Sequence, residues 1–324
     1  MKVIVHRGTQ QIGGCVTEIA TEKTRIILDF GTELPDATGK VPNETLAIEG
    51  VNRGEPNCSA VLFSHYHTDH TGQMDKILPG IPLYLGSVTK QILSALQRRL
   101  RSETLAVIEK AREILPLQKF VIGDLQIVPL PADHSAYDAA MFLISKGKKK
   151  VLFTGDFRLH GYRGGATEKI IKKYVGKVDV LITEGTLLSR PSAVLSEFDL
   201  QARIKPLLQK YKYVFVLCSS LNIDRLGTFH NNTPKGRYFI CDAFQKEIFT
   251  IAAKSSVSQY YKFEKALTYG TNLKLREQGF VMPIRQNDWF KSILTDYKDE
   301  PGAILLYSMW DGYLDGRDQE LLEF

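Results

Sequence analysis

Four side chains of the types that bind metal ions lie within six consecutive residues. The apolar run 60–64 leads directly into the sequence HYHTDHTG, which supplies His65, His67, Asp69 and His70. In extended backbone His65 and His67 project to the same side, because side chains alternate with a period of two. Packing rarely requires so many such groups together, whereas Zn²⁺ and similar ions prefer nitrogen and carboxylate donors. The cluster therefore predicts a metal site.

Two later segments place a ligand-type residue just after an apolar run. His134 follows the run 125–129 within LPADHSAYDA, and Asp156 follows the run 151–154 within VLFTGDF. Taken alone, each could be a turn, capping or structural residue. Strand ends along one sheet edge would bring both to the first cluster, so we predict that His134 and Asp156 are further metal ligands.

Short apolar runs alternate with glycine-rich or polar turns through the first 190 residues. This pattern predicts strands at 2–5, 16–20, 25–30, 60–64, 83–85, 125–129, 140–145, 151–154 and 178–183. The longest helical stretch, 87–114, contains no glycine or proline. It predicts one helix, or two helices that meet near Ser102.

The chain changes character near residue 190, at the polar turn SRPS. Beyond it, helix-like stretches at 196–210, 243–253 and 288–297 alternate with apolar strands at 213–218 and 303–308. Such alternation is typical of a smaller α/β unit. We therefore predict two domains, 1–190 and 191–324.

Composition sets mild limits on location and partners. The 324 residues carry 42 Lys and Arg against 36 Asp and Glu, a net charge of +6, which fits an anionic substrate but is common without one. No apolar run reaches membrane-spanning length, and the first ten residues lack signal-peptide features. Four scattered cysteines without a CxxC pair favour free thiols. We expect a cytoplasmic protein with no membrane partner.

The metal-binding motifs resemble those of the metallo-β-lactamase superfamily. The resemblance rests on HxHxDH at 65–70, on His134, on Asp156 in TGD and on Asp29 in ILDFG. It covers residues 1–190 and implies an αββα sandwich. It also implies two divalent metal ions, most simply Zn²⁺, bound by six side chains: His65, His67 and His134 at the first ion, Asp69 and His70 at the second, and Asp156 bridging them. Asp69 would also orient the attacking water, and Asp29 would support the site by hydrogen bonding.

A narrower resemblance is to the β-CASP branch of this superfamily, which includes ribonuclease J. It rests on GTQQIGGCVTEI, TGDFRLHG, LITEGT and CSSLNIDRL. It implies that Glu184, in LITEGT, marks the passage to an inserted β-CASP domain and belongs with Asp69 and Asp29 to the catalytic residues. The fold expected is therefore an αββα sandwich with an inserted smaller α/β domain. The function implied is cleavage of phosphodiester bonds by metal-activated water. We expect RNA as the partner, with DNA and a homodimer as open alternatives.

Polar residues near two of these motifs are candidates for substrate binding. Four follow the strand at 213–218: Ser219, Ser220, Asn222 and Arg225. Hydroxyl, amide and guanidinium groups there could face phosphates, or they could be a helix cap and a surface arginine. Arg158 and His160, close to Asp156, could contact substrate or only brace their loop, and bracing is the simpler interpretation.

The sequence also departs from the branch. Its members carry two further histidines after the inserted domain, whereas His230 is the last of the seven histidines here. We expect a truncated form of a longer protein rather than a divergent one, with an incomplete second metal site and weak or absent activity. Two other functions stay open: hydrolysis of a thioester, lactone or small phosphodiester, and a non-catalytic nucleic-acid-binding subunit. GTQQIGG and Glu184 argue against the first, and the intact HxHxDH argues against the second.

Overall fold

The computed structural model describes residues 1–35, 40, 46–188, 194–270, 272–314 and 319–324, and the chain forms two compact units. The first unit comprises Met1–Pro35, Val41–Leu159 and Arg163–Ala193. The second comprises Asp36–Lys40, His160–Tyr162 and Val194–Phe324. The domain boundary expected near residue 190 lies in the segment 189–193, outside the described residues.

Six strands of the first unit form a mixed sheet, in the order β1-β2-β3-β4-β5-β6. They are β1 (Lys2–Arg7), β2 (Val16–Ala20), β3 (Arg25–Leu28), β4 (Ala60–Leu62), β5 (Leu83–Gly86) and β6 (Arg112–Ile114). The pairs from β1 to β3 are antiparallel, and the pairs from β3 to β6 are parallel. The carboxyl ends of β3 and β4 therefore lie at the same edge of the sheet.

Five strands form the second sheet of this unit, in the order β11-β10-β9-β8-β7. They are β7 (Phe120–Ile122), β8 (Leu125–Pro131), β9 (Ala140–Lys146), β10 (Lys149–Phe153) and β11 (Val180–Ile182). The pairs from β7 to β10 are antiparallel, and β11 is parallel to β10. Consequently β8, β10 and β11 all end at one edge of this sheet.

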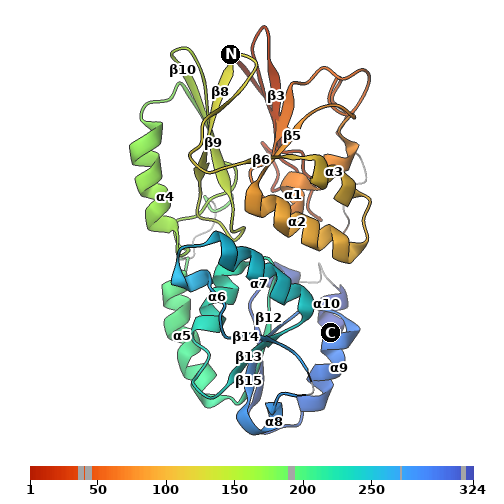
Figure 1. Cartoon of the computed structure of the whole chain (residues 1–324), viewed down its shortest axis with the longest axis vertical. Coiled ribbons are helices and arrows are strands. Elements are labelled where there is room, and N and C mark those ends of the chain that lie inside the picture. Colours follow the sequence, from red (N-terminus) through yellow and green to blue (C-terminus); the bar gives the residue numbers. More distant parts are fainter. Residues whose placement is uncertain (36–39, 41–45, 189–193, 271, 315–318) are drawn as a thin grey trace. The chain divides into compact units, whose positions relative to one another are not determined.

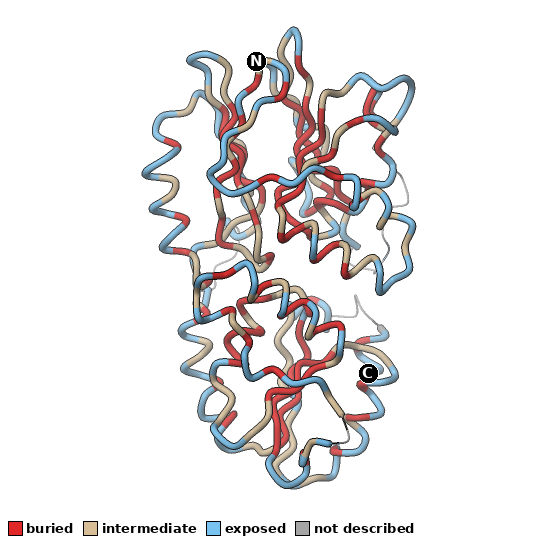
Figure 2. Tube along the Cα trace, viewed as in Figure 1, coloured by how far each residue is buried: buried red, intermediate tan, exposed pale blue. Residues whose placement is uncertain are grey.

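The two sheets pack face to face around one apolar core (Figure 1, Figure 2). Ile26 and Leu62 from the first sheet and Ile127 and Phe142 from the second are fully buried in it. Each such side chain stabilises the unit by about 1.5–3 kcal/mol relative to an exposed one. The outer faces carry α2 (Ser87–Leu100) and α3 (Thr104–Lys110) on one side and α4 (Gly164–Ile170) on the other. This arrangement confirms the predicted αββα sandwich.

The stretch 87–114 forms two helices and a strand, so the interpretation as a single helix is wrong. Its first helix, α2, ends at Leu100 and is followed by Arg101, which has a left-handed backbone with φ 54°. The two helices meet near Ser102, as the two-helix alternative expected, and the hydroxyl of Ser102 accepts a hydrogen bond from the backbone N–H of Thr104. The last residues form β6 beside β5, a strand that the sequence did not predict.

The second unit contains a parallel five-stranded sheet, in the order β14-β13-β15-β12-β16. Its strands are β12 (Tyr213–Leu217), β13 (Tyr238–Cys241), β14 (Ala266–Thr268), β15 (Phe280–Ile284) and β16 (Ala303–Tyr307). Its helices are α5 (Glu197–Lys210), α6 (Ile223–Asn231), α7 (Ala243–Ser255), α8 (Leu275–Gln278), α9 (Asp288–Tyr297) and α10 (Gln319–Glu323). The predicted smaller α/β unit is thus present. No helix among the described residues is long and apolar enough to span a membrane.

Candidate metal centre

The candidate ligands lie where strands of the two sheets end. The HxHxDH segment follows β4 and continues into the short helix α1 (Thr68–Thr71), which contains Asp69 and His70. His134 follows β8, and Asp156 follows β10. A backbone hydrogen bond from Ala140 to Ser64, 2.9 Å long, links the two sheets at this edge. The topology therefore brings together residues that lie up to 91 positions apart in the sequence.

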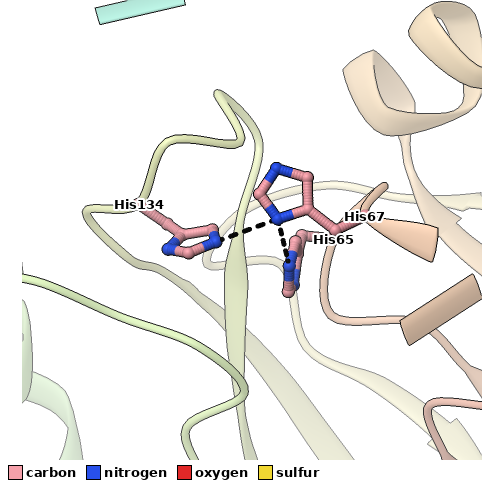
Figure 3. A group of neighbouring side chains, drawn as sticks. All are labelled: His65, His67 and His134. Atoms are coloured by element: carbon pink, nitrogen blue, oxygen red, sulfur yellow. Dashed lines mark hydrogen bonds between the residues drawn. The ribbon is translucent and has the colours of Figure 1, made fainter. Parts of the chain in front are cut away.

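Three imidazoles point their ring nitrogens at one another (Figure 3). Nδ1 of His67 lies 3.1 Å from Nε2 of His65 and 3.2 Å from Nε2 of His134. Nδ1 of His67 can carry only one proton, so it can donate to only one of these neighbours. Two nitrogens bound 2.0–2.1 Å from a tetrahedral Zn²⁺ ion would be about 3.3 Å apart. The observed spacing therefore fits a shared metal ion better than a chain of hydrogen bonds.

The protonation of this triad also favours a metal. Burial and the nearby charge of His70 lower the pKa of His67 to about 4 and the pKa of His65 well below its ordinary value. Burial and the neighbouring His67 likewise lower the pKa of His134. The three rings are therefore neutral near pH 7, which leaves lone pairs for a cation.

A second group of donors lies beside the first. One ligand atom each of His65, His70 and Asp156 lies within 4.8 Å of the others. Nε2 of His70 is buried without a hydrogen bond, 3.3 Å from Oδ1 of Asp156 and 3.6 Å from Oδ2 of Asp69. A buried nitrogen facing two carboxylates is an incomplete environment that a divalent cation would complete. The donor set thus also fits a second metal ion.

Asp29 orients His70 from behind. Its Oδ2 accepts a hydrogen bond of 2.7 Å from Nδ1 of His70, which leaves Nε2 directed at the candidate metal position. Oδ1 of Asp29 accepts the backbone N–H of Ser64, and Oδ2 also accepts the Ser64 hydroxyl. Ser64 Oγ lies 3.0 Å from Nδ1 of His65 as well. One aspartate and one serine therefore fix the orientation of two candidate ligands.

His70 and the carboxylates beside it shift one another's pKa values. Burial alone would lower the pKa of His70, but the carboxylates of Asp29 and Asp156 raise it well above its ordinary value. Burial would likewise raise the pKa of Asp156, but the adjacent His70 and the imidazoles of His134 and His67 lower that pKa to about 2. Asp156 is therefore an anion at neutral pH, the state in which a carboxylate binds a metal ion.

A cleft of about 620 Å³ opens beside the second group. It is lined by the loop 8–13, by Asp69, His70 and Asp156, and by the residues after β11. Gly13 has φ 79°, and a Cβ there would lie 2.9 Å from Cβ of Asp69, so only glycine lets the loop approach so closely. The GTQQIGG motif therefore forms one wall of the cleft.

Glu184, just after β11, supports the turn that carries Asp156. Its Oε1 accepts the backbone N–H of Phe157 at 3.0 Å, and its Oε2 accepts that of Thr186 at 3.3 Å. Because Phe157 directly follows Asp156, this carboxylate holds the turn that presents Asp156. These contacts make Glu184 a positioning residue for Asp156. A catalytic role of Glu184 stays a prediction.

The residues predicted to bind substrate lie in two places. Arg158 is in the first unit, where its Nε lies 3.7 Å from Oδ1 of the buried Asp133. The backbone oxygen of His160 accepts the N–H of Glu197 within the second unit. The other four residues follow β12 in the second unit: Ser219, Ser220, Asn222 and Arg225.

These four residues help to build the second unit itself. Asn222 caps α6 by accepting the backbone N–H of Arg225, as the capping alternative expected. Ser219 accepts the N–H of Leu221, and Ser220 accepts a hydrogen bond from Arg285. The guanidinium of Arg225 bonds the buried Glu197 and the hydroxyl of Ser308. Their part in substrate binding stays a prediction.

Residues 24–205 match the model of the β-lactamase superfamily domain, and the chain belongs to that superfamily. Two relatives come from Methanocaldococcus jannaschii. A "Probable RNase MJ4" is 25% identical over 205 residues, 57% of this chain and 45% of the relative. An "RNase J-like protein" is 28% identical over 193 residues, 56% of this chain and 41% of the relative.

An "Endoribonuclease ysh1" of Aspergillus fumigatus is 30% identical over 148 residues, 39% of this chain and 17% of the relative. These relatives confirm the resemblance to the β-CASP branch, although the matched part spans less than half the length of each. A crystal structure of a protein of unknown function from Enterococcus faecalis V583 has a TM-score of 0.71 at 21% identity. The match covers 94% of this chain and 87% of the Enterococcus faecalis chain, and it shows a similarity of fold alone.

Proposed function

We propose that this chain is a metal-dependent ribonuclease of the β-CASP type, which cleaves phosphodiester bonds at a two-metal centre. The observation that carries the proposal is the convergence of imidazole and carboxylate donors at one edge of the αββα sandwich. The names of the relatives support RNA as the substrate. Buried free thiols at Cys218 and Cys241 support a reducing, cytoplasmic location.

Each candidate ligand has a defined part in this proposal. His65, His67 and His134 would hold one ion, while His70, Asp69 and Asp156 would hold the other. Zn²⁺ ions bound there would lower the pKa of a water molecule to about 7 and stabilise charge on a phosphoryl oxygen. The neutral triad and the anionic Asp156 are the protonation states that such binding requires. The pKa of His70 is raised, so an ion bound at its Nε2 would displace a proton.

The remaining chemistry falls to residues along the cleft. Asp69 lies on the cleft wall, and its carboxylate can accept a proton from the attacking water and orient that water. Arg158, two residues after Asp156, would attract a phosphate through its positive charge. Asp29 keeps Nε2 of His70 directed at the site throughout.

The experiment is a cleavage assay on the chain after metal depletion and reloading with Zn²⁺. We expect weak cleavage of labelled single-stranded RNA that is lost on chelation, because the expected second metal site is incomplete. Asp69→Asn should lower the rate by about 10²–10⁴-fold, because it removes a proton acceptor. Asp75→Asn, six residues further along and paired with Lys76, is the matched control and should cleave normally.

The same protein is tested on DNA, a thioester and a lactone. Metal-dependent hydrolysis of the thioester or lactone without RNA cleavage would contradict the ribonuclease proposal. RNA binding without bound metal and without cleavage would instead identify a binding subunit.

A further inference from the structure

Arg163, the residue before α4, binds the loop that carries His134. Its Nη2 donates to the backbone oxygens of His134 at 2.8 Å and Ala136 at 3.2 Å. Its Nη1 donates to the backbone oxygen of Tyr137. The guanidinium carbon also lies 5.0 Å from the centre of the Tyr137 ring. A single side chain thus contacts three carbonyl groups within four residues of chain.

Three other side chains make hydrogen bonds that fix the same loop, which lies between β8 and β9. Thr167, in α4, accepts the backbone N–H of Asp133 at 2.7 Å. Tyr66, between two candidate ligands, accepts the backbone N–H of Tyr137 at 2.8 Å. Asp138 accepts two backbone N–H groups at the start of α2, from Val88 and Thr89, at 3.0 Å each. The loop is therefore tied to α4, to the HxHxDH segment and to α2.

The loop needs these side chains because it has little regular structure of its own. It connects β8 to β9, and the ladder bonds of these strands end where it begins. Its carbonyl groups need hydrogen-bond donors, because an unpaired buried carbonyl costs free energy. Arginine suits three convergent carbonyls because its planar group offers five donors in a fixed geometry, whereas lysine offers a single rotating ammonium.

We infer that Arg163 is a positioning residue for the metal centre. By fixing the carbonyls of residues 134, 136 and 137, it holds Nε2 of His134 at the 3.2 Å spacing from His67 that a shared ion requires. The inference rests on the metal-binding part of the proposed function and is independent of the substrate. It concerns a residue that lies outside the donor set and that no motif in the sequence indicated.

The test measures metal affinity by chelator competition, together with the absorption spectrum of the Co²⁺-substituted protein. Arg163→Lys keeps the charge but cannot reach three carbonyls. We expect the affinity at the site of the three histidines to fall by about 10–100-fold, as is typical when a supporting partner of a ligand is lost. The Co²⁺ spectrum should change because the position of one imidazole is no longer fixed.

Arg237→Lys is the matched control. Arg237 donates to the backbone oxygens of Leu208, Gln209 and Tyr211 in the second unit, so the substitution removes the same kind of contact away from the donors. It should lower stability without changing metal affinity. An equal loss of affinity in this variant would show a general effect of destabilisation and would overturn the inference.

Tyr66→Phe provides a second variant if Arg163→Lys fails to fold. It removes only the oxygen that accepts the N–H of Tyr137, and we expect a several-fold loss of affinity. Wild-type affinity in the folded Arg163→Lys protein, or in Tyr66→Phe where Arg163→Lys does not fold, overturns the inference. A wild-type protein that binds no metal contradicts the proposed function instead, so the two failures are distinguishable.

Discussion

Asp29 combines an unusual backbone with three hydrogen bonds at the candidate metal centre. Its φ of 60° lies in the left-handed region, which costs a residue with a side chain roughly 1 kcal/mol or more. The same conformation directs its carboxylate at both Ser64 and His70. Backbone strain of this kind persists where the surroundings fix the residue, commonly at functional sites.

Replacing this carboxylate with an amide tests its role in orienting His70. Asn tolerates the left-handed backbone, so Asp29→Asn keeps the local fold. Its single oxygen cannot accept all three hydrogen bonds, and its NH₂ group would oppose one of the donors. We expect metal affinity at the group of His70 and Asp156 to fall by about 10–100-fold, measured by metal content after dialysis.

The control for this substitution is Asp124→Asn, at the turn between β7 and β8. Asp124 bonds Thr21 and Lys146 and has no metal-ligand neighbour among its described contacts. Its replacement should leave metal content unchanged. If Asp29→Asn retains both ions as the wild-type protein does, the carboxylate is not needed to orient His70.

At the residue scale, the sequence indicates donors much better than it indicates their supports. His65, His67 and His70 are recognisable because their spacing is local, and His134 and Asp156 because each follows an apolar strand. Ser64 and Arg163 carry no such signal. Serine before a histidine is common, and the carbonyls that Arg163 binds lie 26 to 29 residues away in the chain. Only the packing of α4 against the second sheet makes that contact possible.

At the element scale, the stretch 87–114 shows where periodicity stops being informative. Its residues favour helix throughout, so the end of α2 at Leu100 carries no glycine or proline signal. The strand β6 has only three residues, and its extended conformation comes from pairing with β5. Short strands such as β6 and β7 cannot be predicted from their own residues, because their neighbours supply the hydrogen bonds.

The left-handed backbone at Arg101, directly after α2, can be tested by substitution. Arg101→Gly should stabilise the protein by about 0.5–1 kcal/mol, because glycine adopts positive φ without strain. The loss of a positive charge at the helix end offsets about 0.3 kcal/mol of that gain. The measurement is the free energy of unfolding in urea.

The control is the same substitution one residue earlier. Leu100 is exposed and still within α2, so Leu100→Gly should destabilise the protein by about 1 kcal/mol. Destabilisation by both variants would show that the backbone at Arg101 is not left-handed in solution.

At the scale of the whole molecule, the two units differ in what they contain. All the candidate metal donors belong to the first unit, whereas Trp289 and Trp310, the two tryptophans of the chain, belong to the second. Each unit has its own apolar core, one between the two sheets of the sandwich and one on the parallel sheet. A metal ion should therefore stabilise the first unit, and tryptophan fluorescence should report on the second.

Chelation should separate the unfolding of the two units. An ion present at 100 times its dissociation constant stabilises its unit by about 2.7 kcal/mol, equivalent to about 5–10 °C for a unit of this size. Chelator should lower the midpoint of thermal unfolding followed by circular dichroism. It should also increase hydrogen exchange in peptides that contain 60–70 and 130–157. The midpoint of thermal unfolding followed by tryptophan fluorescence should not move, because no candidate ligand lies in the second unit.

His67→Ala, which lacks one of the donors, should already unfold at the lower midpoint and should respond little to chelator. If the fluorescence midpoint falls by as much as the other, the two units unfold as one cooperative body.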